Sequence, residues 1–291
     1  MNAGIKKICR FGWGTLRRHL VPGTRHCVLL AADSRYYDPC RIALNSFLHH
    51  NPGWTPVVVD VGFTEDQRRA ILDDGVLLRS EPRGQHAKWV AGHARLRVLM
   101  DLLISQQFDL LAILECDTAT LGAVDASGDV SRFMQSRQFY GVVAGDNWGF
   151  VVFKPWLRAI RVFRDVCGTI HDLDNTFVML EESAATVAMW YHKQTPYRLD
   201  AATNCFLPWQ RDRLQEIGRR GMRLEGGGPV AVLHYSGDVL NHALTHGEAG
   251  LDPRYVAPVR VWHEYRRLVR ERDAFLQPRE FADFVGPSSG S

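Results

Sequence analysis

The chain has 291 residues, of which 46% are hydrophobic, 10% aromatic and 23% charged, and its formal net charge is +3. This composition is typical of a folded domain and excludes wholesale disorder. No apolar stretch approaches the roughly 18 residues of a membrane span, and the first 26 residues lack the apolar core of a cleaved secretory signal. Six scattered cysteines without a CxxC pair indicate reduced thiols in a cytoplasmic protein rather than a structural zinc site.

Positive charge is concentrated near the start of the chain. Residues 1–26 contain six basic side chains and no acidic one, so the remaining residues sum to −3. That balance argues against nucleic-acid binding by the main body. Residues 5–20 interleave apolar and basic side chains, as a helix lying on an anionic membrane does, and a solvated basic tail is the alternative. We therefore expect a basic N-terminal extension over residues 1–24, with peripheral membrane contact as one of its two roles.

The first part of the chain alternates predicted strands and helices. Thr64 and Gln67 form a capping-box pattern that begins a short helix. Apolar runs predict strands over 25–33, 55–62, 75–80 and 110–114, and helical spacing predicts helices over 39–50 and 87–106. Alternation of this kind predicts a parallel α/β sheet with right-handed crossovers. Ligands of such sheets bind beyond the carboxyl ends of the strands, which is where Asp33, Glu115 and Asp117 fall.

The second part of the chain is less regular. Apolar runs predict strands over 139–146, 148–153 and 229–237, and helical spacing predicts helices over 156–167, about 174–190 and 259–275. The last of these helices is basic, and the final residues "GPSSGS" are small and polar. We expect one main domain over 25–257, a basic helix within 258–284 and a disordered tail over 285–291.

Two carboxylates, Glu115 and Asp117, follow the fourth predicted strand, one residue apart. A buried charge without a partner costs several kcal/mol, so both groups should be paired or bound to a metal ion. The turn after the first strand, "AADSRYYDP", is not a glycine-rich phosphate loop. A divalent cation, Mg²⁺ or Mn²⁺, can neutralise nucleotide phosphates where such a loop is lacking. The alternative is that the two acids cap a turn or pair with arginines.

Six blocks of the sequence, in order over about residues 26–240, resemble the GT-A-fold glycosyltransferases of family 8. That family contains retaining galactosyl- and glucosyltransferases, including glycogenin and bacterial lipopolysaccharide enzymes. The blocks are "LLAADSRYYDPCRIALNSFLHHNPG", "VDVGFTEDQRRAI", "HARLRVLMDLL", "LAILECDTATLG", "DNWGFVVF" and "VAVLHYSG". The resemblance implies a GT-A fold, with a Rossmann-like mixed central sheet flanked by helices and a looser C-terminal part. It makes residues 25–257 the catalytic domain.

The resemblance assigns roles to individual residues. Glu115, Asp117 and His234 would hold a metal ion, and a histidine beside two carboxylates favours Mn²⁺ over Mg²⁺. A packed core histidine is the alternative for His234. The residues that the resemblance places around the nucleotide-sugar are Ala31, Asp33, Tyr36, Arg95, Glu115, Cys116 and Gly237. Of these, Tyr36 would stack on the uracil.

Two positions depart from the family pattern. The first metal carboxylate of the family is usually aspartate, whereas Glu115 is one methylene longer. The late family block "HYxGxxKPW" supplies a lysine to the diphosphate, but Leu240 stands at that position here. His242 or a nearby arginine could replace the lysine, and otherwise donor affinity and turnover would be poor.

The acceptor-side "DQD" motif of the family corresponds to "HDLDNTF" in this chain, in one of two registers. One register matches Asp172 and Asp174, and the other matches Asp174 and Asn175. We prefer Asp174 and Asn175 as catalytic residues, because a polar side chain can steady the sugar, and the same resemblance adds Asn147. The alternative is that Asp174 and Asn175 cap the helix that begins near residue 175.

The resemblance implies transfer of a hexose, with retention, from a nucleotide-sugar that we expect to be UDP-linked. The acceptor would be a carbohydrate, a lipid-linked molecule or a protein. Retention leaves two mechanisms open, a carboxylate nucleophile or same-face attack assisted by the leaving phosphate. Two other classes compete with this interpretation. The first is a non-catalytic nucleotide-sugar-binding relative, and the second is a sugar nucleotidyltransferase, against which the lack of a glycine-rich loop argues.

Overall fold

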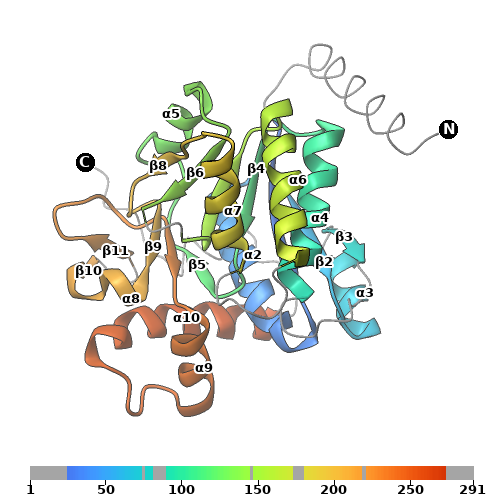
Figure 1. The fold of residues 1–291 in the computed structure, drawn as a ribbon. Helices are drawn as coiled ribbons and strands as arrows, with labels where there is room; N and C mark the ends of the chain where they lie inside the picture. The colour runs from blue at the N-terminus through green and yellow to red at the C-terminus, as the bar shows by residue number, and fades with distance from the viewer. Residues whose placement is uncertain are drawn as a thin grey trace.

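A computed structural model of the chain describes residues 25–73, 76–80, 90–144, 147–172, 180–217 and 221–272. At its centre lies a seven-stranded sheet in the order β3-β2-β1-β4-β7-β6-β8 (Figure 1). In that order the strands are Leu77–Ser80, Trp54–Asp60, His26–Ala32, Leu110–Leu114, Phe150–Phe153, Tyr140–Val143 and Tyr197–Leu199. The first four strands in this order are parallel, whereas β7 is antiparallel to both β4 and β6. The predicted fold class, α/β with a mixed central sheet, is confirmed.

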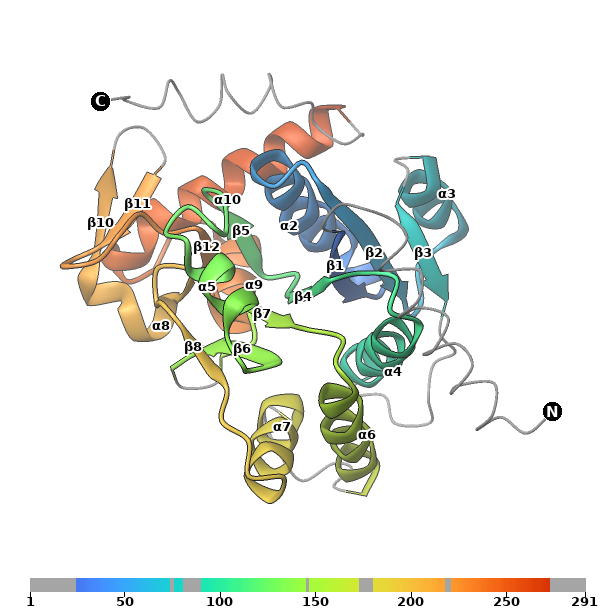
Figure 2. The ribbon, with the colours of Figure 1, turned by 90° about the horizontal axis from the view of Figure 1, so that it is seen from above.

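Helices cover both faces of this sheet. The helices α4, α6 and α7 lie on one face, and α2 lies on the other with α10 packed against it (Figure 2). The helices are Tyr37–His50 (α2), Glu65–Asp73 (α3), Val90–Ser105 (α4), Asp129–Gln135 (α5), Leu157–Asp172 (α6), Leu180–Tyr191 (α7), Leu207–Gln210 (α8), Gly237–His246 (α9) and Pro253–Arg272 (α10), with 3₁₀ turns at Ser34–Tyr36 (η1) and Arg211–Arg213 (η2). None of the helices in the described part of the chain is long and apolar enough to cross a bilayer.

The strand β1 shows why the central strands are unbroken apolar runs. Its side chains point alternately to the two faces of the sheet, as in any strand. Cys27 and Leu29 belong to the core beneath α4, α6 and α7, whereas Val28 and Leu30 belong to the core beneath α2. Because both faces are covered, every position must be apolar, and the alternation of polar and apolar residues found in half-exposed strands is lost.

The capping box predicted at the start of α3 is confirmed. The backbone N–H of Thr64 donates to Gln67 Oε1 at 3.0 Å, and the backbone N–H of Gln67 donates to Thr64 Oγ1 at 3.3 Å. These reciprocal bonds satisfy two N–H groups that have no partner inside the helix. The local sequence alone therefore determines where this helix begins.

A second, three-stranded sheet brings the C-terminal part of the chain close to the end of β4. Its strands, in the order β5-β12-β9, are Thr118–Thr120, Val232–His234 and Asn204–Phe206. The central strand β12 is antiparallel to β5 and parallel to β9. A third apolar core, which includes Leu233, Tyr235, Trp262 and Tyr265, joins this sheet to α9 and α10. A hairpin of β10 (Leu214–Ile217) and β11 (Gly221–Leu224) lies beside it.

The helix α10 begins earlier than the sequence predicts. It runs from Pro253 to Arg272, so the expected division at residues 257 and 258 falls inside one helix. Pro258 lies in its second turn, where the missing N–H costs one helical hydrogen bond. Its carbonyl accepts a hydrogen bond from the Tyr235 hydroxyl at 2.9 Å, and the burial of Trp262 and Tyr265 anchors the helix to the main body.

Several short elements had no counterpart among the predicted ones, namely β5, α5, β8, β9, α8, β10, β11 and α9. The strands among them have three or four residues, which is too few to show a hydrophobic period. Three predictions lie outside the described residues: the extension over 1–24 with its membrane-contact segment, the acceptor-side pair Asp174 and Asn175, and the tail over 285–291.

Candidate metal centre

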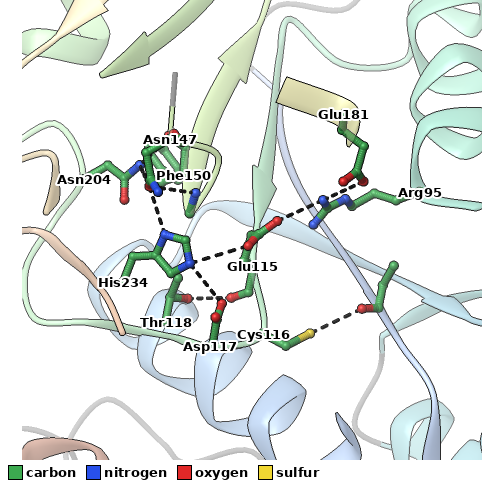
Figure 3. A network of polar contacts seen from close by, with 12 residues as sticks. Arg95, Glu115, Cys116, Asp117, Thr118, Asn147, Phe150, Glu181, Asn204 and His234 are labelled. Atoms are coloured by element: carbon green, nitrogen blue, oxygen red, sulfur yellow. Dashed lines mark hydrogen bonds and ion pairs between the residues drawn. The ribbon is translucent and has the colours of Figure 1, made fainter. Parts of the chain in front are cut away.

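Strand pairing brings two carboxylates and an imidazole together at the carboxyl edge of the central sheet. Glu115 directly follows β4, Asp117 directly precedes β5, and His234 is the last residue of β12. Because β5 and β12 are antiparallel, His234 lies opposite Thr118, the neighbour of Asp117. The backbone N–H of Tyr235 also donates to the Asp117 carbonyl at 3.0 Å. All three side chains point toward one another (Figure 3).

The spacing of the three side chains fits a divalent cation. His234 Nε2 lies 3.1 Å from Asp117 Oδ1 and 3.5 Å from Glu115 Oε2, and one ligand atom from each residue lies within 4.8 Å of the others. In an octahedral site with ligands at about 2.1 Å, neighbouring ligand atoms are about 3.0 Å apart. Two oxygen atoms and one imidazole nitrogen at these separations can share one ion and leave positions open for a substrate.

The orientation of the His234 ring is set by Asn147. Asn147 Oδ1 accepts a hydrogen bond from the backbone N–H of Gly149 at 3.1 Å and from Asn204 Nδ2 at 3.0 Å, which identifies it as the carbonyl oxygen of the amide. His234 Nδ1 lies 2.9 Å from the same oxygen and must therefore donate to it. The lone pair of the neutral ring is then on Nε2, facing the two acids, which is the tautomer that a metal ion needs.

Asn147 thus contacts His234 of the candidate metal centre. The sequence predicts Asn147 as a catalytic residue, and the structure shows a side chain that is 3% exposed and whose oxygen is contacted by three donors. Asn204, which extends this network, was not predicted. It lies on the three-residue strand β9, and no sequence pattern marks that strand.

The close approach of Gly149 to His234 excludes any other residue there. A Cβ atom at Gly149 would lie 2.4 Å from His234 Nδ1 and 2.7 Å from His234 Cβ. The Gly149 carbonyl accepts from the backbone N–H of Glu115 at 3.0 Å, so neither backbone can move away easily. A glycine at this position lets β7 pass directly beneath the imidazole ring.

A buried arginine supports Glu115 from the opposite side. Arg95 Nη2, on α4, lies 3.0 Å from Glu115 Oε1 and 3.0 Å from Glu181 Oε1, on α7. The other oxygen of Glu115, Oε2, is the one that faces His234. One oxygen of the longer glutamate side chain thus contacts Arg95, and the other faces His234 in the candidate metal centre. Arg95 was predicted near the nucleotide, and the structure places it beside Glu115, a carboxylate of the candidate metal centre.

Glu181 and its neighbour Glu182 were missed by the sequence analysis. Their signal was two adjacent acids at the start of an otherwise apolar helix, "LEESAATVAMWY". Burial, followed by the charges of Glu115 and Glu181, raises the pKa of Glu182 to about 8. Burial also raises the pKa of Glu181, although Arg95 opposes this shift. The carboxyl groups of Glu115 and Glu181 therefore share the Arg95 guanidinium, with Glu182 and Asp117 close by, and a divalent cation would balance the negative charge gathered here.

The side chains of Asp117 and His234 shift each other's pKa. Burial would raise the pKa of Asp117, but the charge and hydrogen bond of His234, a backbone hydrogen bond and the charge of Arg95 together outweigh burial and lower that pKa below its ordinary value. Burial would lower the pKa of His234, but Asp117 and Glu115 outweigh burial and raise it. A divalent cation would take the place of the imidazole proton as the positive partner of these acids.

Residues predicted to bind the nucleotide gather beside this centre. A Cβ atom at Gly237 would lie 3.9 Å from the Tyr36 hydroxyl oxygen. Burial, then the charge of Asp117, raises the pKa of Tyr36, and Asn241 forms a hydrogen bond to it. Tyr36 ends η1, which follows β1, and Gly237 begins α9, which follows β12. The structure therefore brings the ends of β1, β4 and β12 to one place.

Three further predicted residues have partners within the chain. The Cys116 thiol donates to the Ala31 carbonyl at 3.3 Å, which ties the end of β4 to the end of β1. The Asp33 carboxylate accepts from the backbone N–H groups of Arg35 and Tyr36 and pairs with the Arg35 guanidinium at 2.8 Å. Asp33 therefore shapes the turn that carries Tyr36.

The position expected to supply a lysine is part of the core. Leu240 is 1% exposed and belongs to the apolar core beneath the second sheet. His242, which the sequence offers as a substitute cation, has its Nε2 atom 2.9 Å from the Ala249 carbonyl. Helix α9 therefore carries the apolar Leu240 at the position where the glycosyltransferases of family 8 carry a lysine.

The architecture described here, with an acidic turn after β4 and an antiparallel β7 beside it, is the GT-A fold of glycosyltransferases. By sequence, the chain matches no protein-family model and no curated protein. Among solved structures, the galactosyltransferase LgtC in complex with donor and acceptor sugar analogues matches with a TM-score of 0.53 and 13% identity, over 88% of this chain and 99% of that one. An active-site mutant of LgtC matches with a TM-score of 0.51 and 17% identity, over 72% and 87% of the two chains.

The glycosyltransferase GlyE of Streptococcus pneumoniae has the same fold. Its TM-score is 0.57 and its identity 14%, over 92% of this chain and 66% of that one. Likeness at such low identity establishes the fold.

Proposed function

We propose that this chain is a metal-dependent glycosyltransferase that moves a hexose from a UDP-linked sugar to an acceptor hydroxyl with retention. The observation that carries the proposal is the convergence of Glu115, Asp117 and His234 at the carboxyl edge of the sheet, with the imidazole set by Asn147 in the metal-binding tautomer. The GT-A fold supports the same reaction class. Retention and the UDP group follow from the resemblance to family 8.

Each residue has a defined task in this reaction. Glu115, Asp117 and His234 would hold Mn²⁺ or Mg²⁺, which as a Lewis acid stabilises the departing diphosphate. Tyr36, beside Gly237, would bind the uridine. Arg95 would hold the Glu115 carboxylate in place through one 3.0 Å contact, while a second 3.0 Å contact joins Arg95 to Glu181. Breaking the bond to the sugar places positive charge on the ring and negative charge on the diphosphate, and the site orients both groups.

The acceptor side remains a prediction on Asp174 and Asn175, and no nucleophile is assigned. The acceptor would be a carbohydrate, a lipid-linked molecule or a protein. A cytoplasmic protein with residues 5–20 on a membrane surface would favour a lipid-linked acceptor. Deletion of residues 1–20 would then abolish binding to liposomes that contain anionic lipid, and unchanged binding would reject this part of the proposal.

The test is release of UDP from a panel of UDP-sugars in the presence of Mn²⁺, with and without candidate acceptor sugars. We expect activity that chelation abolishes and that Asp117→Asn reduces to background. Asp101→Asn, which removes an exposed carboxylate on α4, is the matched control and should retain activity. UDP release that persists in EDTA would contradict the proposal.

A non-catalytic nucleotide-sugar-binding protein is the second candidate, because the buried Leu240 occupies the position of the lysine that serves the diphosphate in family 8. Such a protein would be stabilised against heat by a UDP-sugar with Mn²⁺, since a ligand of the native state raises its stability. It would release no UDP from any sugar in the panel. Stabilisation and turnover measured on the same samples therefore distinguish the two candidates.

A further inference from the structure

The outer face of helix α7 is apolar toward the end of the helix. α7 packs beside α6 on one face of the central sheet (Figure 1). Its inner face, which includes Ala185 and Met189, belongs to the core. Its outer face carries Val187, Trp190 and Tyr191, which are 52%, 76% and 73% exposed. These three residues are spaced i, i+3 and i+4, so they lie together on one side of the helix.

An outer face of this kind is unusual for a surface helix. Such a helix normally turns charged and polar side chains to the solvent, and a helix that is apolar all round is normally covered all round. Residues 183–191 of α7, "SAATVAMWY", contain no charged side chain. Single exposed apolar residues are common, whereas two adjacent aromatic rings with a valine one turn away form a contiguous patch. We therefore expect another surface to cover this face.

Basic side chains border the apolar face of α7. The segment that follows α7 runs along α6, because His192 Nε2 lies 2.7 Å from Asp165 Oδ2 and Arg158 Nη1 donates to Gln194 Oε1 at 3.3 Å. Lys193, between these two contacts, is exposed, and so is Arg158. The contact of Arg158 is with a neutral amide and leaves its positive charge in place. Two exposed cations therefore lie next to the aromatic rings.

The first part of α6 adds to this positive charge. From Leu157 to Asp165 the helix carries three arginines and one acid, "LRAIRVFRD". The acid, Asp165, lies 3.4 Å from Arg164 and is also the partner of His192. Arg161, one turn after Arg158, is exposed. The border of the apolar face is therefore basic, and it matches a surface of negative charge.

The start of α6 lies at the edge of the sheet where the described chain begins. Leu111 of β4 pairs with Cys27 of β1 on one side and with Phe153 of β7 on the other. α6 begins at Leu157, shortly after Phe153, and the first described residue is Arg25. The basic N-terminal extension predicted from the sequence is thus attached at this same edge. A negatively charged surface that meets α6 and α7 is within reach of the extension as well.

We propose that the outer face of α7 docks on an anionic lipid membrane, with Trp190 and Tyr191 among the headgroups and Arg158 and Lys193 beside the lipid phosphates. Tryptophan and tyrosine suit a membrane–water interface, because each combines an apolar ring with a polar atom. A protein partner is less suited to this face, since lysine is depleted in protein interfaces. The site is on the folded body, separate from residues 5–20, and it does not depend on the proposed function.

The first experiment measures flotation of the full chain with vesicles of phosphatidylcholine alone and of a three-to-one mixture of phosphatidylcholine and phosphatidylserine. We expect binding to the mixed vesicles. Trp190→Gln should weaken that binding at least tenfold, because the ring no longer leaves water on docking. Trp209→Gln is the matched control, since Trp209 is also exposed, by 53%, but lies on α8. Melting temperatures equal to that of the native chain verify that both variants are folded.

The second experiment tests the basic border with the same vesicles. Arg158→Gln should weaken binding to the mixed vesicles roughly fivefold, since one cation near the anionic surface is lost. Arg267→Gln, on α10, should have no effect, because Arg267 already pairs with Glu264 at 3.2 Å and Glu271 at 2.9 Å.

The proposal is overturned if the native chain does not bind the mixed vesicles, or if Trp190→Gln binds them as Trp209→Gln does. Light scattering on the same samples measures self-association. Self-association that Trp190→Gln abolishes, with vesicle binding unchanged, would also overturn the proposal and assign the outer face of α7 to a second copy of this chain.

Discussion

The strands β4 and β12 both end at the metal centre, but they are held in different ways. β4 lies inside a seven-stranded sheet with apolar cores on both faces. β12 has three residues and lies in a three-stranded sheet that depends on the core beneath α9 and α10. Glu115 thus adjoins the central sheet, whereas Asp117 lies between the two sheets and His234 belongs to the second sheet. The site is complete only when the second sheet is docked against the first.

The largest effect should follow from removing the metal ligand that the second sheet is proposed to supply. His234→Ala should weaken Mn²⁺ binding by more than about 100-fold, because loss of an outer partner alone costs 10- to 100-fold. The measurement is the rise in melting temperature on titration with Mn²⁺. His242→Ala removes a ring that contacts the Ala249 carbonyl, so it should leave Mn²⁺ binding intact. Equal loss in both variants would contradict the assignment of His234.

The next effect concerns the residue that orients the imidazole. Asn147→Ala removes the oxygen that accepts from His234 Nδ1, so the ring loses both its tautomer and its orientation. We expect Mn²⁺ affinity to fall roughly 10- to 100-fold while the fold is retained. Calorimetric titration gives the affinity, and circular dichroism checks the fold. Affinity equal to that of the native chain would show that Asn147 does not position the ring.

Crowding the boundary between the two sheets should cost stability as well as metal affinity. Gly149→Ala places a methyl group 2.4 Å from the position of His234 Nδ1. Overpacking of this kind costs about 1–3 kcal/mol of unfolding free energy. Gly168→Ala is the control, because a Cβ atom there meets nothing within 4 Å and the residue lies in the helix α6. Urea denaturation should show a loss for the first variant and none for the second.

The smallest expected effect is a pH dependence of the unfolding free energy that arises from two histidines of α2. Burial lowers the pKa of His49 to about 4, and burial with the charge of His49 lowers the pKa of His50 to about 4. Unfolded histidine has a pKa near 6.5, so below that pH the unfolded chain binds protons that the folded chain does not. Stability is therefore full above about pH 6.5 and falls as the pH drops toward 4.

Urea midpoints measured between pH 7.5 and 4.5 test this pH dependence. His50→Gln should reduce the slope over this range, because one of the two partly buried rings is gone. His246→Gln, on an exposed position of α9, should leave the slope unchanged. The same slope in all three proteins would show that the partly buried histidines of α2 do not govern acid stability.

Much of the central sheet and its helices could be predicted from the sequence. The strands β1, β2 and β4 are long apolar runs because both of their faces are covered, and the capping box of Thr64 and Gln67 begins α3 as predicted. Glu115 and Asp117 could be predicted as candidate site residues, because charges that follow a buried strand need partners. These features are local, since each depends on residues within a few positions of one another.

The second, three-stranded sheet could not be predicted in this way. β5, β9 and β12 have three residues each, and the pairing of β5 with β12 joins Thr118–Thr120 to Val232–His234, which are distant in the chain. Nothing in the local sequence says that Asn147 faces His234, that Glu181 shares Arg95 with Glu115, or that Leu240 points into a core. These contacts depend on how whole layers pack, which is the sum of many small apolar contributions.

The sequence by itself determined the α/β class, the order of the first strands and helices, and the two acids at the end of β4, because buried runs and helix caps are encoded by neighbouring residues. Only the tertiary structure decided which nitrogen of His234 faces those acids, which oxygen of Glu115 faces Arg95, and where the arginines of α10 meet α2. Such choices are made by partners that are distant in the chain, and they exist only once the sheets and helices have docked.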